Sequence, residues 1–130
     1  MPLIDHLSVG VPDIAKARQF YDPLMDLLGV TCLDADDEFA AYGTSRPEFL
    51  LLLPFDGQPA TSGNGTHIAF VASSPEQVAA FHESALANGG TDEGASGPRD
   101  FYPMSGCTTA YVRDPFGNKL EVLCNGFSSL

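Results

Sequence analysis

The sequence predicts an α+β protein built from two βαβββ modules, because the 130-residue chain contains two copies of one pattern. Each copy opens with a histidine at the start of a short strand, and a helical stretch follows. Phe20 lies 14 residues after His6, and Phe81 lies 14 residues after His67. The copies align again near their ends at an offset of 69 residues, where Glu121 falls opposite Leu52. At that offset Tyr42 also falls opposite Tyr111.

The first copy begins with an alternating strand over residues 6–11. Asp13 is placed to cap the following helix, whose apolar residues recur at helical spacing. These are Ile14, Ala17, Phe20, Tyr21 and Leu24. Proline lacks an amide hydrogen, so we expect Pro23 to break or kink this helix before Gly29. Three strands follow, near residues 30–33, 39–42 and 49–53.

A linker rich in glycine and proline, about residues 56–65, separates module one, about 1–57, from module two, about 66–130. The second copy opens with a strand over residues 67–72, and Ser74-Pro75-Glu76-Gln77 is a strong helix start. The predicted buried stripe of that helix is Val78, Phe81, His82, Ala85 and Leu86. A long loop, residues 94–106, leads to strands over residues 108–113 and 119–124, which a turn at residues 114–118 joins. Each copy is interpreted as a strand, a helix and three strands, of which two are located after the second helix.

Composition limits the classes of partner. The formal net charge of −11 argues against nucleic acid and against anionic membranes, because phosphate groups would repel the chain. No apolar run approaches the roughly 20 residues that span a bilayer. The first five residues carry neither a basic segment nor a long apolar one, so we expect a cytoplasmic protein. The three cysteines lack metal-site spacing, and we expect them to be small buried hydrophobic residues.

Alternation along the strands places three potential metal ligands on the sheet face opposite the helices. Three apolar trios can pack against helices: Leu7/Val9/Val11, Ile68/Phe70/Ala72 and Leu120/Val122/Cys124. His6, His67 and Glu121 are then left together on the opposite face, where a charged residue needs a partner. Taken singly, His6 is more often structural and Glu121 is more often an exposed strand residue. Together, two imidazoles and one carboxylate suit divalent Fe, Mn, Co, Ni or Zn, with positions open for water or substrate.

These residues resemble the vicinal oxygen chelate superfamily, which includes glyoxalase I, extradiol dioxygenases, fosfomycin-resistance thiol transferases and bleomycin-resistance proteins. The resemblance covers essentially the whole chain. It is carried by residues 5–13 (DHLSVGVPD), Phe20-Tyr21, residues 65–70 (GTHIAF) and residues 112–122 (VRDPFGNKLEV). It implies one glyoxalase-like domain over residues 1–130, whose modules pair into a curved, cup-like mixed sheet with helices on the outer face. It also implies metal ligation by His6, His67 and Glu121, and a homodimer. Whether the modules pair within one chain or across the dimer stays open.

The chain departs from that family pattern at one ligand position. Glyoxalase I-like proteins commonly have a fourth ligand, usually a carboxylate, in the late strand of the first module. Leu52 stands there, and leucine cannot coordinate a metal. Glu48 lies four residues earlier, more than about 10 Å along a strand. Glyoxalase I activity itself is therefore doubtful.

Other branches of the superfamily fit incompletely. Extradiol dioxygenases use a further histidine, and the remaining one here, His82, lies on the predicted buried stripe and is interpreted as structural. Fosfomycin-type transferases need a cationic pocket, and the chain has only six lysines and arginines in total.

The sequence favours a metal-dependent enzyme with lyase, isomerase or dioxygenase chemistry on a small oxygenated molecule bound through two neighbouring oxygens. Glu121 is predicted to be a ligand and the catalytic base, and Tyr102 to donate a hydrogen bond to a developing oxyanion. The predicted substrate-binding residues are Arg99, Tyr102 and Tyr111, and Tyr42 is expected to line the cup with Tyr111. The alternative is a metal-free binding protein of the bleomycin-resistance type, with which the acidic charge agrees. A purely structural or interaction module is a third class.

Overall fold

The computed structural model describes residues 2–130, which form two α-helices, eight strands and a short 3₁₀ helix. Module one contains β1 (Leu7–Gly10), α1 (Ile14–Leu27), β2 (Thr31–Ala35), β3 (Phe39–Gly43) and β4 (Pro47–Leu52). Module two contains β5 (Ile68–Val71), α2 (Pro75–Ala87), β6 (Thr91–Pro98), β7 (Thr108–Arg113) and β8 (Lys119–Cys124), followed by η1 (Phe127–Ser129). The predicted α+β class and the two βαβββ modules are confirmed.

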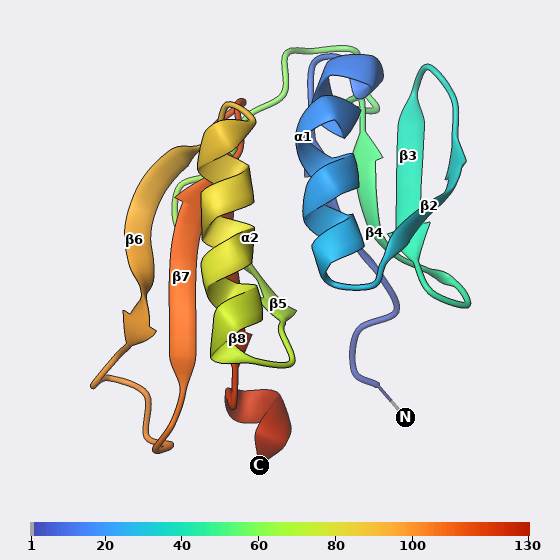
Figure 1. Cartoon of the computed structure of the whole chain (residues 1–130). Helices are drawn as coiled ribbons and strands as arrows, with labels where there is room; N and C mark the ends of the chain where they lie inside the picture. The colour runs from blue at the N-terminus through green and yellow to red at the C-terminus, as the bar shows by residue number, and fades with distance from the viewer. Residues whose placement is uncertain (1) are drawn as a thin grey trace.

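Each module forms its own four-stranded mixed sheet, in the order β1-β4-β3-β2 or β5-β8-β7-β6. The first strand of each module pairs in parallel with its last, and the other pairs are antiparallel. In Figure 1, α1 and α2 lie side by side in the middle of the molecule, with β2 and β3 on one flank and β6 and β7 on the other. Within residues 2–130 the two sheets share no hydrogen-bonded strand pair.

Local signals in the sequence placed the start of each helix correctly. The Asp13 side chain accepts a hydrogen bond from the backbone N–H of Lys16, and the Ser74 side chain accepts one from that of Gln77. The predicted apolar stripe of α1 is buried, as are Val78, Phe81 and Ala85 of α2. Both helices and one face of each sheet therefore enclose a shared core. No helix within residues 2–130 has the length and apolar character that crossing a membrane requires.

Three expectations about local structure were wrong. Pro23 does not break α1, which continues to Leu27 because packing of its buried face outweighs the one missing amide hydrogen bond. Leu86 is exposed, since its place on α2 lies just beyond the buried stripe. The segment expected to begin a loop at Gly94 belongs instead to strand β6, which pairs with β7 despite a composition poor in strand-forming residues.

The two modules are joined mainly through their core sides. The helices pack against each other. The rings of Phe49 and Phe70 meet edge to face with centroids 5.1 Å apart. The turn after β7 adds polar links, because buried Asp114 accepts a 2.5 Å hydrogen bond from the Tyr21 hydroxyl and Asn118 donates to the Gly10 carbonyl at 3.0 Å. With their core faces turned toward each other, the modules leave the opposite face of each sheet open.

Candidate metal and substrate site

The open face of module two carries a buried carboxylate, Glu121, whose exposed fraction is 1%. One oxygen, Oε2, accepts hydrogen bonds from the hydroxyl groups of Tyr102 at 2.5 Å and Thr109 at 2.6 Å. The other, Oε1, lies 3.1 Å from the Nε2 atom of His67. A buried carboxylate needs such partners to offset its lost hydration, and here two donors and an imidazole supply them.

The register of the sheet brings these residues together. Glu121 on β8 has Tyr111 of β7 as its neighbour on one side and Ala69 of β5 on the other. His67 lies two residues before Ala69, so it projects from the same open face. Thr109 lies two residues before Tyr111 and shares that face as well. Sequence reasoning missed Thr109. The only local signal was that Thr109 alternates with Ala110 along the strand, and alternation does not show that Thr109 contacts Glu121.

The donor atoms of His67 and Glu121 fit a shared divalent ion. Two donor atoms bound at right angles to one ion, each about 2.1 Å away, lie about 3.0 Å apart. The observed 3.1 Å between Nε2 and Oε1 is close to that spacing and is also an ordinary hydrogen-bond distance. Because Tyr102 and Thr109 occupy Oε2, Oε1 is the oxygen presented beside the imidazole.

The third predicted ligand lies elsewhere in the chain. His6 directly precedes β1, on the open face of module one, and its Nδ1 atom lies 2.7 Å from the carboxylate of Asp5. Within residues 2–130, no three histidine, cysteine, aspartate or glutamate side chains gather into a metal-binding group. The structure thus brings together two of the three predicted ligands and leaves His6 apart from them.

Tyr102, predicted as an oxyanion donor, instead directs its hydroxyl to Glu121. Partial burial and the adjacent carboxylate raise the pKa of Tyr102 well above its usual value. The phenol therefore remains a neutral donor and holds Glu121 in place. The Tyr102 ring also packs against Phe101 and against Phe127 of η1, which anchors the loop after β6 over the carboxylate.

Tyr111 forms an aromatic platform next to this pair. Its ring centroid lies 6.1 Å from that of His67. Two cations lie over the same ring, with the Arg99 guanidinium carbon 5.9 Å and the Lys119 Nζ atom 5.4 Å from its centroid. Of the residues predicted to bind substrate, Tyr102 contacts Glu121, Tyr111 lies beside His67, and Arg99 lies with Lys119 over the Tyr111 ring.

The first module has no carboxylate at the position that corresponds to Glu121. The strand register shows that this position differs from the one that the sequence offset indicated. Ser8 and Ala69 each lie two residues after a module's histidine; Ser8 pairs with Leu50, whereas Ala69 pairs with Glu121. Leu50, rather than Leu52, is therefore the structural counterpart. Both leucines face the open side, so the absence of a fourth carboxylate at this position holds either way.

Tyr42 does not line the open face as expected. It is fully buried on the core side, and its hydroxyl donates a 2.5 Å hydrogen bond to Asp22 of α1. The offset of 69 residues matched it to Tyr111, but Ala41 pairs with Leu50 as Tyr111 pairs with Glu121, so Ala41 is the structural counterpart of Tyr111 and Tyr42 projects from the other face.

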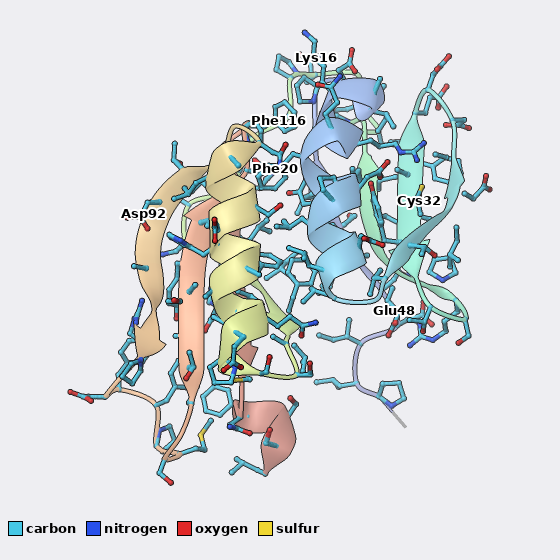
Figure 2. All side chains as sticks on the ribbon, in the orientation of Figure 1. Lys16, Phe20, Cys32, Glu48, Asp92 and Phe116 are labelled. Atoms are coloured by element: carbon cyan, nitrogen blue, oxygen red, sulfur yellow. The ribbon has the colours of Figure 1, made fainter. Side chains whose placement is uncertain are left out.

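The remaining residues considered in the sequence are His82, Glu48 and the three cysteines, which have structural surroundings of their own. His82 lies 2.9 Å from the carboxylate of Asp92 and ties α2 to β6 (Figure 2 labels Asp92). Glu48, labelled near the start of β4 in Figure 2, pairs with Arg46 at 3.6 Å. Cys107 and Cys124 are buried as free thiols, and burial raises the pKa of Cys107. Cys32 is half-buried rather than buried.

Comparisons with known proteins agree with this architecture. A family model described as the Glyoxalase/Bleomycin resistance protein/Dioxygenase superfamily matches residues 3–122. Among solved structures, a glyoxalase/bleomycin resistance protein from Albidiferax ferrireducens T118 is 40% identical, covers 95% of this chain and 99% of its own, and superimposes with a TM-score of 0.85.

Two more distant structures share the fold. A glyoxalase-related enzyme from Fulvimarina pelagi is 21% identical over 96% of this chain and 89% of its own, with a TM-score of 0.72. A lactoylglutathione lyase from Agrobacterium tumefaciens is 21% identical over 96% of both chains, with a TM-score of 0.63. No curated protein matches the chain significantly.

Proposed function

Since the chain belongs to the Glyoxalase/Bleomycin resistance protein/Dioxygenase superfamily, we propose that it is a metal-dependent enzyme acting on a small oxygenated molecule. The observation that carries the proposal is the pairing of buried Glu121 with exposed His67 on an open sheet face. Burying a carboxylate costs free energy, so a carboxylate that is held by two hydroxyl groups beside an imidazole is more consistent with a functional ligand than with a residue that has no function. The ion would be divalent Fe, Mn, Ni, Co or Zn.

The residues of module two have separate roles in this proposal. His67 Nε2 and Glu121 Oε1 hold the ion, which when bound supplies Lewis-acid polarisation of a substrate oxygen. Thr109 and Tyr102 keep Oε2 occupied and fix the plane of the carboxylate. Glu121 is also the group that would take a substrate proton, at Oε1 once that oxygen no longer holds the ion, while Tyr102, which stays protonated, keeps its hydrogen bond to Oε2.

We propose that the third ligand, His6, comes from a second copy of the chain in a homodimer. β1 and β5 are edge strands, and His6 and His67 directly precede them. The surface near these edges exposes Leu3, Ile4 and Val71. Exposed apolar sheet edges tend to be buried against another chain. If β1 of one copy lay beside β5 of the other, His6 of the first copy would lie near His67 and Glu121 of the second. It would also close the cup across the dimer.

Metal content tests the proposed enzyme. Inductively coupled plasma mass spectrometry on tag-free protein is expected to find near-stoichiometric metal, and the His67→Ala and Glu121→Ala variants are expected to lose it. His82→Ala is the matched control, because that histidine also contacts a carboxylate but lies away from the site. A wild-type protein that stays metal-free after reconstitution would overturn the proposal and favour the metal-free binding protein.

Complementation tests the shared site. His6→Ala and Glu121→Ala chains are each expected to lose metal as homodimers. In a mixed dimer, the unaltered His6 of one chain meets the unaltered Glu121 of the other. Co-refolding equal amounts should therefore restore metal to about a quarter of all sites, since about half of the dimers are mixed and each has one intact site. No recovery in purified mixed dimers would place all ligands in one chain and refute the shared site.

A further inference from the structure

The positive charges of this acidic chain are distributed unevenly. Six lysines and arginines face seventeen acidic residues. Three of the six are neutralised locally: Arg18 pairs with Asp22, Arg46 with Glu48, and Arg113 with Glu93. Among residues 2–130, the remaining three, Lys16, Arg99 and Lys119, form no ion pair with a carboxylate.

Two of these three cations converge on one ring. Arg99 and Lys119 both lie within 6 Å of the Tyr111 centroid, although they come from the loop after β6 and from β8. Each gains a cation–π contact there. Lys16, in contrast, lies at the N-terminal end of α1 (Figure 2), where it contributes to no such cluster.

Arg99 is held in position by backbone rather than by charge. Its Nη2 donates to the carbonyl of Ala95 at 2.7 Å, and its Nη1 lies 3.2 Å from the carbonyls of Gly97 and Pro98. The side chain crosses β6 where two glycines leave room. A Cβ atom on Gly94 would lie 3.0 Å from Arg99 Nη2, and one on Gly97 would lie 3.6 Å from Nη1. These contacts fix the guanidinium but leave its charge uncompensated and some of its five N–H donors free.

From this arrangement we propose that Arg99 and Lys119 form an anion subsite beside the Tyr111 ring, and that the substrate is a small molecule bearing a carboxylate or phosphate group. The oxyanion binds the guanidinium and the ammonium, and the remainder of the molecule extends over Tyr111 toward His67 and Glu121. The carboxylate of Glu121 does not compete for these cations, because its oxygens already contact Tyr102, Thr109 and His67. This inference deepens the proposed function by naming the substrate class.

Anion binding is testable without metal. Metal-stripped protein is titrated with benzoate and with benzamide, which have the same shape but differ in charge, and binding is followed by calorimetry and by NMR shifts of Tyr111. Benzoate is expected to bind about tenfold or more tightly, the factor that one charge-assisted hydrogen bond provides. Phenyl phosphate forms the third arm: tighter binding than benzoate assigns a phosphate-bearing substrate, and weaker binding assigns a carboxylate.

Variants identify the cations. Lys119→Met keeps an unbranched apolar stem over Tyr111 and removes the charge, and Arg99→Gln removes the guanidinium. Each is expected to cut benzoate affinity about tenfold while benzamide binding is unchanged. Lys16→Gln is the matched control, since it makes the same charge change away from the site. Because Arg99 also donates to backbone carbonyls of β6, Lys119→Met keeps the test valid even if Arg99→Gln disturbs that strand.

The outcomes separate this inference from the proposed enzyme. Equal binding of benzoate and benzamide, or unchanged benzoate affinity in Lys119→Met, overturns the anion subsite even if the wild-type protein holds its metal. A preference for benzoate that depends on Lys119 and Arg99 upholds the subsite even if mass spectrometry finds no metal and the enzyme proposal fails.

Discussion

Oε1 of Glu121 lies 3.1 Å from Nε2 of His67, and the two side chains differ sharply in exposure, at 1% and 44%. The imidazole therefore gives a buried carboxylate its contact with the open face of the sheet. Since Tyr102 and Thr109 both bind Oε2, the carboxylate can turn only by breaking two hydrogen bonds. This one-sided arrangement gives the pair a defined direction and leads to the first prediction.

Replacing Thr109 with valine should weaken metal binding without unfolding the protein. Valine has nearly the same shape but cannot donate to Oε2, so the carboxylate loses one of its two orienting bonds. We expect metal affinity to fall about tenfold or more, and the free energy of unfolding to fall by about 1–3 kcal/mol. A competition titration against a metal-binding dye measures the first, and urea denaturation measures the second.

Thr108→Val is the control for that experiment, because Thr108 is the preceding residue of β7 and projects from the other face. It should leave metal affinity unchanged. Equal affinity in Thr109→Val and the wild type would show that Tyr102 alone is enough to orient Glu121.

The four tyrosines should ionise in the same pH range in which the protein unfolds. Burial, as the largest cause, raises the pKa of each above the ordinary value of 10.0. The folded state thus favours the neutral phenol. Its stabilising contribution is complete below pH 10.0 and is lost as the pH rises through the higher pKa values of the folded state. We expect tyrosinate absorbance and loss of circular dichroism to follow one transition above pH 10.0.

Tyr111→Phe is a useful comparison, because it removes a half-buried tyrosine of the open face and leaves the buried Tyr21 and Tyr42. The two transitions should still coincide in that variant. Ionisation of several tyrosines at pH 10.0 in a protein that retains its circular dichroism would contradict the prediction.

Replacing Pro23 with alanine should stabilise the protein. The proline lies inside the continuous helix α1, where it cannot donate the hydrogen bond that alanine would. The gain is partly offset by the greater freedom of the unfolded alanine chain, which leaves a net increase of about 1–2 kcal/mol in the free energy of unfolding. Chemical denaturation measures the change.

Pro75 is the matched control for this substitution, since it lies at the first position of α2, where no amide hydrogen bond is lost. Pro75→Ala should not raise the free energy of unfolding and is expected to lower it by about 0.5 kcal/mol. A loss of stability in Pro23→Ala would mean that the proline ring makes packing contacts worth more than the missing hydrogen bond.

The Phe49–Phe70 contact should couple the two modules. A double-mutant cycle with Phe49→Leu and Phe70→Leu is expected to give a coupling energy of about 0.5–1.5 kcal/mol, as for other edge-to-face ring pairs. A second cycle with Phe49→Leu and Phe101→Leu serves as the reference, because Phe101 is exposed and contacts Tyr102 instead. Strict additivity for Phe49 and Phe70 would leave the packing of α1 against α2 as the dominant link between modules.

Local patterns predicted the parts of this fold that depend on near neighbours in the sequence. Asp13 and Ser74 cap their helices as expected because a cap involves residues only three positions apart. Strand alternation likewise placed the apolar trios on the core side, with the exception that Leu7 is exposed and lies outside the core cluster. The strand β6 was missed because Thr91–Pro98 has little strand propensity of its own and is held by its pairing with β7.

The site shows the same division. His67 and Glu121 could be assigned to one face from alternation and from the family resemblance. Thr109 could not, because its role depends on lying beside Glu121 in a ladder between β7 and β8. The choice between Leu50 and Leu52 as counterpart of Glu121 also needed the register, since both leucines alternate onto the same face.

The sequence by itself determined the two modules, their helices and the face from which each candidate ligand projects, because periods of two and 3.6 residues are properties of the backbone. Only the tertiary structure decided which of those ligands meet. Pairing of β5 with β8 brings Glu121 beside His67. Packing of α1 against α2 turns the core faces of the two sheets toward each other, and His6 stays with the other sheet. Contacts between residues far apart in sequence depend on how whole elements pack, which no local period encodes.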